Sequence, residues 1–79
     1  MLTQLQNTAK VVGVKQTRRA LNDGRAKEVF LARDADPILT EPLAVQAEEK
    51  GIEIRWIESM KALGKACGIA VGAAVAATI

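Results

Sequence analysis

Apolar positions along the chain follow two alternating spacings, which predict a succession of short strands and helices. Short segments in which apolar residues predominate favour strands at residues 11–12, 28–32, 52–57 and 73–79. Apolar residues three and four apart favour helices at residues 2–9, 14–23, 40–50 and 60–67. The run at 28–32 reads as a strand buried on both sides. This order predicts a small layered α/β fold with helices on both faces of the sheet.

Capping residues set the expected bounds of the helices. Asp36, followed by Pro37, and Ser59 carry side-chain oxygens that suit the start of a helix. Pro42 lacks an N–H group, so we expect a loose turn at 37–39 and a regular helix only from about residue 40. A glycine follows each of three predicted helices and is expected to end it: Gly24, Gly51 and Gly68.

Charge is unevenly distributed, although the net charge of the 79 residues is only +2. Residues 1–33 hold seven basic and two acidic residues, whereas residues 34–58 hold seven acidic and two basic ones. A basic first third suits a polyanionic partner, with the acidic middle turned away from it. The alternative is an ordinary solvated surface.

Several function classes are excluded by composition. The chain has no His and one Cys, Cys67, so it has neither an internal disulfide nor a histidine general base, and a structural zinc site is effectively excluded. We expect Cys67 to be a small buried hydrophobe in a reducing compartment. Residues 1–10 lack the apolar core of a signal peptide, and the uncharged stretch 66–79 is too short to span a membrane.

The segment from Gly13 to Arg19 places cations at the start of a predicted helix. Lys15, Arg18 and Arg19 lie three and four apart, a spacing at which like charges repel, and they oppose the helix dipole. An anion at the helix start would relieve both effects, and Gly13 would leave its approach open. Gln16 adds a donor and an acceptor that suit a base edge. The alternative is a solvated basic face with Gly13 as a plain cap.

Two further motifs each leave two interpretations open. Ile69 and Val71, in an apolar loop ending at Gly72, could be core residues or an exposed lip against unstacked bases. Asp34 and Asp36 could ligate a metal, but a helix cap explains Asp36 more simply, and no third ligand is evident.

Three blocks of the sequence resemble the kink-turn RNA-binding ribosomal protein family: VGVKQT at 12–17, KEVFLARDADP at 27–37 and LGKACGI at 63–69. The family includes archaeal and eukaryotic large-subunit proteins, a component of small nucleolar particles, and short bacterial members, which this chain resembles most. The resemblance implies a three-layer α/β/α sandwich with a mixed sheet of about four strands. It also implies the ligand, a sharply bent RNA duplex whose bulge is flanked by sheared G·A pairs.

The resemblance also implies roles for individual residues. The helix after Gly13 would enter the widened major groove, where Lys15 and Gln16 would contact guanine edges. Arg18 and Arg19 would hold the RNA backbone. Asp36 lies where the family often has an acid near the bulge. The loop Ile69-Ala70-Val71 would cover the bulged nucleotides. The archaeal and eukaryotic proteins usually carry Asn-Glu where this chain has Lys15-Gln16, and Lys in place of Arg19. The resemblance therefore does not fix the affinity of this chain for RNA or the kink-turn sequence that it prefers.

We therefore expect one kink-turn RNA-binding domain over residues 1–79, a cytoplasmic, non-catalytic monomer. Its partner would be RNA, with no cofactor, metal, membrane or small-molecule substrate. One alternative is a protein–protein adaptor that uses the acidic region 34–58. Another is a small RNA- or nucleotide-acting enzyme with Asp34 and Asp36 as metal ligands.

Overall fold

Four strands form one mixed sheet in this computed structural model, which describes residues 8–79. They are β1 (Lys10–Val12), β2 (Glu28–Ala32), β3 (Glu53–Ile57) and β4 (Val75–Thr78), in the spatial order β1-β4-β2-β3. β4 runs antiparallel to both of its neighbours, while β2 and β3 are parallel. The last strand in the chain is therefore enclosed within the sheet, between β1 and β2.

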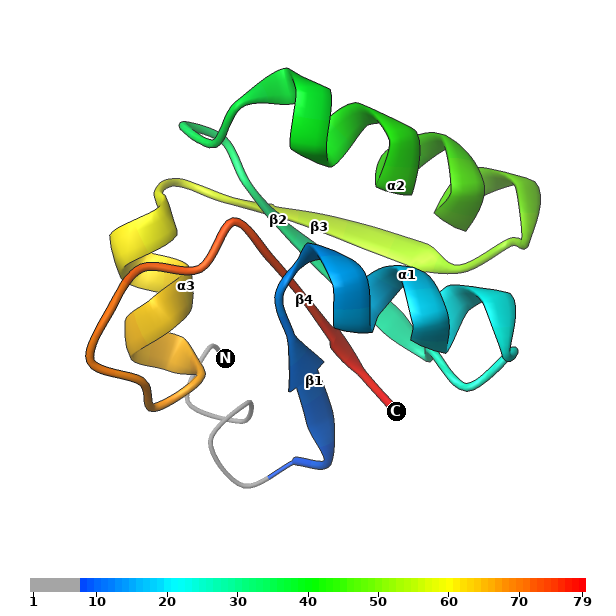
Figure 1. The fold of residues 1–79 in the computed structure, drawn as a ribbon, viewed down its shortest axis with the longest axis horizontal. Coiled ribbons are helices and arrows are strands. Elements are labelled where there is room, and N and C mark those ends of the chain that lie inside the picture. The colour runs from blue at the N-terminus through cyan, green and yellow to red at the C-terminus, as the bar shows by residue number, and fades with distance from the viewer. Residues whose placement is uncertain (1–7) are drawn as a thin grey trace.

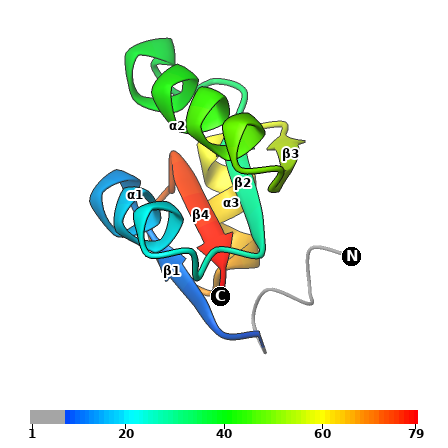
Figure 2. The same ribbon diagram turned by 90° about the vertical axis from the view of Figure 1, so that its right-hand side faces the viewer.

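Three helices cover the two faces of this sheet. α1 (Val14–Asn22) and α2 (Pro37–Glu49) pack side by side on one face, and α3 (Met60–Ala66) packs on the other. Figure 1 shows α3 on the left, α1 on the right and α2 at the top, and Figure 2 gives the view at right angles. The three-layer α/β/α sandwich with a mixed four-stranded sheet is thus confirmed.

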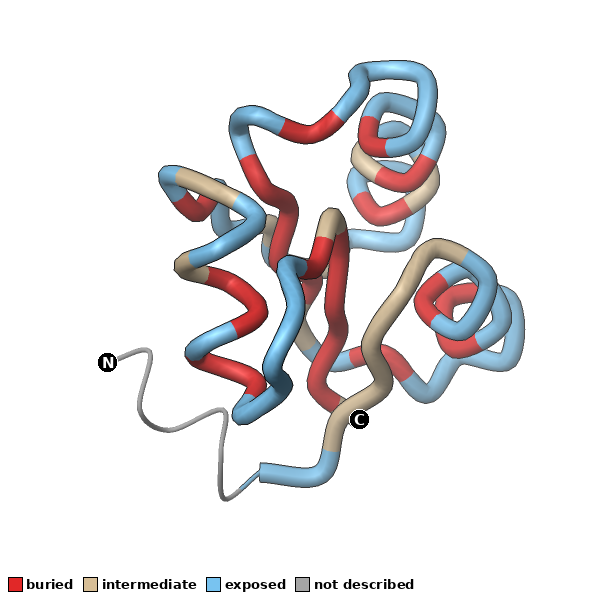
Figure 3. The backbone as a smooth tube through the Cα atoms, turned by 60° about the vertical axis from the view of Figure 1, so that its left-hand side comes forward, coloured by how far each residue is buried: buried red, intermediate tan, exposed pale blue. Residues whose placement is uncertain are grey.

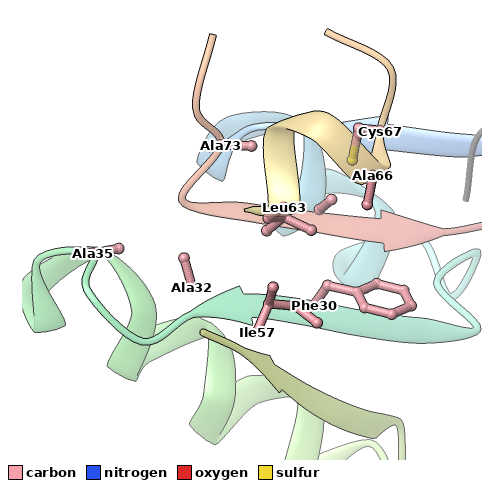
Figure 4. Packing of buried hydrophobic residues seen from close by; sticks show 9 residues of the cluster. Phe30, Ala32, Ala35, Ile57, Leu63, Ala66, Cys67 and Ala73 are labelled. Atoms are coloured by element: carbon pink, nitrogen blue, oxygen red, sulfur yellow. The ribbon is translucent and has the colours of Figure 1, made fainter. Parts of the chain in front are cut away.

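The core is divided by the sheet into two apolar clusters, and the buried backbone concentrates in β2, β4 and the inner faces of the helices (Figure 3). The cluster under α1 and α2 is built largely of Leu, Val and Ala: Ala20, Leu21, Ala26, Val29, Leu31, Leu43, Ala47, Val75 and Ala77. The cluster under α3 contains more small residues: Phe30, Ala32, Ala35, Ile57, Leu63, Ala66, Cys67, Ala73 and Ala76 (Figure 4). Because small side chains bring backbones close together, α3 lies near the sheet.

The capping predictions are confirmed at both helix starts. The side chain of Asp36 accepts a hydrogen bond from the N–H of Ile38 at 3.0 Å, and that of Ser59 accepts one from the N–H of Ala62 at 3.0 Å. The three glycines expected to end helices all have positive φ: Gly24, Gly51 and Gly68. Local chemistry therefore fixes most helix bounds in this chain.

The expected start of α2 at residue 40 is wrong, because the helix begins at Pro37 and contains Pro42. Proline at this depth leaves the carbonyl of Ile38 without a helical donor. Ile38 is 79% exposed, so water can reach that end of the helix. The inner face of this helix includes Thr40, which is buried, whereas the neighbouring Leu39 is 41% exposed.

One other expectation needs correction, and another falls outside the described residues. The last strand begins at Val75 rather than Ala73, because the N–H of Ala73 bonds to the carbonyl of Met60 instead. The predicted helix at 2–9 lies outside the described residues, except for Thr8 and Ala9, which are not helical. Cys67 is buried as expected, and this burial raises the pKa of its thiol, with Lys10 acting in the opposite direction. Within residues 8–79, no helix is long and apolar enough to cross a membrane.

Candidate nucleic-acid interface

Four connecting segments meet at one end of the sheet, which we call the site end. β1 and β2 finish there and β4 begins there: the N–H of Gly13 bonds to the carbonyl of Val75, and that of Ala32 to the carbonyl of Ala74, both at 2.9 Å. β3 finishes there too, since the N–H of Arg33 bonds to the carbonyl of Ile57 at 2.8 Å. The site end therefore gathers the start of α1, the loop after β2, the link before α3 and the segment before β4.

Gly13 opens the start of α1 to solvent. Its backbone has φ 106° and ψ 158°, a conformation that side chains other than hydrogen do not tolerate. Among residues 8–79, no heavy atom beyond its chain neighbours lies within 4 Å of where a Cβ would stand. No side chain caps the helix at this residue, so the first amides of α1 are not satisfied by a cap. The start of α1 is accordingly able to receive an anion.

The predicted cationic group on α1 is exposed and unpaired. Lys15, Gln16, Arg18 and Arg19 are all exposed, and none of their side chains makes a hydrogen bond or ion pair within residues 8–79. No acidic residue lies in the first turn of the helix. Arg25, further along the chain, instead pairs with an acid, Asp23, at 3.4 Å. The unpaired charges at the start of α1 are thus available for a polyanion.

The inner face of α1 holds an unusual polar group. Thr17 is fully buried, yet its hydroxyl has no hydrogen-bond partner in the part of the chain that the structure describes. Arg18 and Arg19 follow it directly on the outer side of the helix. Thr17 therefore belongs to the packing of α1 on the sheet and not to the exposed surface.

Asp34 and Asp36 both have structural partners. Asp36 caps α2, and the carboxylate of Asp34 accepts a hydrogen bond from the N–H of Met60 at 2.7 Å. In residues 8–79 no three of the His, Cys, Asp and Glu side chains are grouped so that they could hold a metal ion. Both carboxylates nevertheless lie exposed at the site end, close to the loop after β2. Asp34 also ties that loop to the first residue of α3.

Residues 68–73, which we call the apolar loop, form an exposed lip up to Gly72, and Ala73 is buried. Val71 is 70% exposed and Ile69 37% exposed, and Ala70 is exposed as well, so the core interpretation of Ile69 and Val71 is wrong. The loop turns back along α3, with hydrogen bonds from Ile69 to Gly64 and from Ala73 to Met60, both 3.0 Å between nitrogen and oxygen (Figure 1). Its far end then leads into β4 beside Gly13.

Arg33 at the site end was not assigned a role from the sequence. It is exposed, directly follows β2, and makes no side-chain hydrogen bond or ion pair within the described residues. The sequence signal that could have found Arg33 is a cation directly after a predicted strand, because binding residues are often located in loops. Its backbone bond to Ile57 places it on the β3 side of β2, across β4 from the start of α1.

The chemistry offered by the site end is binding chemistry. Cations and uncapped helix amides suit phosphate groups, while exposed aliphatic side chains suit the faces of unstacked bases. The apolar loop runs along α3 to the site end, where it leads into β4 beside Gly13. That combination fits a polyanion that also exposes apolar rings.

Comparisons with known proteins agree with this interpretation. A model of the ribosomal protein L7Ae/L30e/S12e/Gadd45 family matches residues 2–79. An RNA-binding protein of Bacillus pumilus is 52% identical over 67 residues, covering 85% of this chain and 82% of that protein. The large ribosomal subunit protein eL8 of Halobacterium salinarum is 40% identical over 68 residues, covering 85% of this chain and 57% of that protein.

A solved structure shares the fold over almost the whole chain. The Giardia lamblia 15.5kD RNA binding protein superposes with a TM-score of 0.90 at 33% sequence identity, covering 98% of this chain and 68% of that one. The resemblance stated from the three sequence blocks is therefore confirmed.

Proposed function

Since the chain belongs to the ribosomal protein L7Ae/L30e/S12e/Gadd45 family, we propose that it is an RNA-binding protein that recognises kink-turns in structured RNA. The observation that carries this proposal is the juxtaposition of two exposed features at the site end. The uncapped start of α1, with Lys15 and Arg19, lies at the end of the sheet where the apolar loop leads into β4. In this proposal the protein acts as a monomer in the cytoplasm. Its target is ribosomal or riboswitch-like RNA.

Each part of the site takes one part of the RNA. Lys15 and Gln16 contact guanine edges at the sheared G·A pairs, because their donors fit guanine O6 and N7 and the Gln16 carbonyl accepts from an amino group. Arg18 and Arg19 hold the phosphate backbone. Gly13 leaves room for the RNA to approach the helix start.

The apolar loop and Asp36 contact the bulge of the kink-turn in this proposal. The side chains of Ile69, Ala70 and Val71 cover the bulged nucleotides, which stack poorly and expose their faces. The carboxylate of Asp36 accepts a hydrogen bond from a nucleotide near the bulge, in addition to capping α2. The chain has only two aromatic residues, Phe30 and Trp56, and Phe30 is buried. Stacking of bases on aromatic side chains therefore contributes little to RNA binding.

The proposed mechanism is a shift of population. A free kink-turn samples extended and bent forms, and a protein that fits only the bent form stabilises that form by its differential affinity. No covalent step is involved, and the protein acts by holding a shape.

The test uses a kink-turn duplex labelled with a fluorescent donor and acceptor at its two ends. The expected result is that the protein raises energy transfer, and binds this duplex far more tightly than a matched duplex whose G·A pairs are replaced by Watson–Crick pairs. Equal affinity for the two duplexes at moderate salt would overturn the proposal.

A second candidate function, a protein adaptor, is favoured by the outer face of α2. Ile38 is 79% and Val45 56% exposed, and three glutamates lie around them on the same helix: Glu41, Glu48 and Glu49. RNA would be repelled by these acids, so the partner would be a basic protein segment with apolar side chains. Absence of kink-turn preference in the energy-transfer experiment would favour this candidate.

A further inference from the structure

We propose that Gly64 is a positioning residue that sets where the apolar loop stands, and thereby the recognition of the bulged nucleotide. This inference rests on the proposed function, since it concerns the same RNA site. Gly64 contacts no RNA in this scheme and acts only through Val71.

The backbone of the apolar loop crosses α3 directly over Gly64. A Cβ at Gly64 would overlap the carbonyl oxygen of Val71 and stand 3.0 Å from the Cα of Gly72. These are backbone atoms, so no side-chain rotation could relieve the overlap. Glycine inside a helix is less favourable than alanine. The adjoining positions Ala62 and Ala66 carry the better helix former, whereas Gly64 does not.

Two further contacts hold the loop against α3. The N–H of Ile69 bonds to the carbonyl of Gly64, and the N–H of Ala73 bonds to the carbonyl of Met60, both at 3.0 Å. A Cβ at Gly72 would stand 3.2 Å from the Cβ of Met60. The loop is thus fastened to α3 by backbone contacts along its length.

This fastening leaves the loop's side chains free to face outward. Val71 is 70% exposed although its carbonyl lies against the helix. The backbone of Val71 is therefore held against α3 while its side chain faces solvent. A rigid contact surface needs this arrangement. A binding site loses its fit when its groups move by more than about 0.5 Å. The overlap at Gly64 is large enough that an alanine there must displace the loop further than this.

The experiment is a double-mutant cycle between the protein and the RNA. Wild-type and Gly64→Ala proteins are each titrated with a kink-turn that has an intact bulge and with one whose bulged nucleotide is abasic. We expect the wild type to bind the abasic RNA about tenfold more weakly, from the loss of contacts to one base face. We expect Gly64→Ala to bind both RNAs with similar affinity, because its loop no longer reaches the base. General destabilisation of the fold would weaken binding of both RNAs equally and leave the tenfold ratio intact.

Gly51→Ala is the matched control. Gly51 also has a positive φ, 69°, and open space at its Cβ position, but it lies between α2 and β3, away from the site end. Its substitution strains the backbone without touching the loop, so it should keep the wild-type ratio. Gly72→Ala is a milder variant for use if Gly64→Ala does not fold, and it should reduce the ratio partway.

The outcomes separate this inference from the proposed function. An unchanged ratio in Gly64→Ala, or in Gly72→Ala if that variant is used, overturns the role of Gly64. A wild type that binds kink-turns but shows no penalty with abasic RNA also overturns it, and leaves kink-turn recognition standing. A wild type with no preference for bent over straight RNA overturns the proposed function itself.

Discussion

The carboxylate of Asp34 accepts a hydrogen bond from the backbone N–H of Met60 at 2.7 Å, so the loop after β2 is joined to the first residue of α3. Asp34→Ala removes the acceptor and should lower the free energy of unfolding by about 1 kcal/mol, the usual contribution of such a bond near a helix start. Asp34→Asn retains an acceptor oxygen and should lie close to the wild type. Urea denaturation followed by circular dichroism measures both. Equal stability of the alanine variant and the wild type would show that this bond contributes nothing.

The three cations of α1 should differ in what their removal does. Lys15→Ala should weaken kink-turn binding by about 1–3 kcal/mol through the loss of a contact to a base, and Arg19→Ala should weaken it through the loss of a phosphate contact. Arg18→Ala should mainly reduce the dependence of affinity on salt, by about one unit of slope on a double logarithmic plot. Lys27→Ala is the control, since Lys27 lies at the start of β2, the other end of the sheet. Wild-type affinity in the Lys15 and Arg19 variants would remove both residues from the interface.

Gly13→Ala combines backbone strain with obstruction of the site. The strain should lower stability by about 1–3 kcal/mol, because the φ of 106° excludes a side chain. The added methyl group would also stand in the open space before the helix, so affinity for kink-turn RNA should fall even where the variant is fully folded. Gly24→Ala is the control: Gly24 has φ 73° and open space at the opposite end of α1. It should lose stability but keep affinity.

Substitutions can separate the two roles of Asp36, which are capping α2 and accepting a hydrogen bond from RNA. Asp36→Ser retains a capping oxygen, so thermal melting should show a stability within about 0.5 kcal/mol of the wild type. Affinity for the kink-turn should nevertheless fall, because the carboxylate acceptor near the bulge is lost. Asp36→Ala should lower stability by about 1 kcal/mol as well as affinity. Undiminished affinity in the serine variant would leave Asp36 as a cap alone.

Thr17→Val should stabilise the protein. The hydroxyl of Thr17 is fully buried and has no partner within residues 8–79, whereas valine has nearly the same shape and no polar group. Removing an unsatisfied buried hydroxyl should raise the free energy of unfolding by about 1 kcal/mol. Differential scanning calorimetry measures the change in Tm. A lower Tm would mean that the hydroxyl is satisfied in solution, for example by a water molecule.

Much of the fold was predictable because local patterns and packing agree in this chain. The strand at 28–32 is a run of β-branched and apolar residues, and it is buried along almost its whole length in the centre of the sheet. Asp36 and Ser59 cap helices by bonds to residues two and three positions later, which sequence spacing reveals directly. Pro42 misled the prediction, because the cost of proline in a helix depends on whether water reaches the carbonyl it leaves unpaired.

The site was predictable only in part, because its halves are joined by the sheet and not by the sequence. Lys15 and the apolar loop are far apart in the chain, and the order of the strands brings the end of that loop beside the start of α1. That order follows from pairing between Gly13 and Val75 at the start of β4. Exposure of Val71 was equally hidden, since an aliphatic residue in an apolar segment is more often buried. Val71 is exposed because its carbonyl packs against Gly64. Such a backbone contact has no signature in a single sequence.

The interior place of β4 has a consequence for protein synthesis. β1 pairs with no other strand in the sheet, so during translation it waits without a neighbour until residues 75–78 have left the ribosome. A nascent chain stopped before that point has β1 without its partner strand, and α1 then packs only on α2 and the apolar cluster beneath it. The proposed contact between α1 and RNA therefore depends on residues 75–78, and a nascent chain that has not yet exposed them is expected to bind RNA weakly.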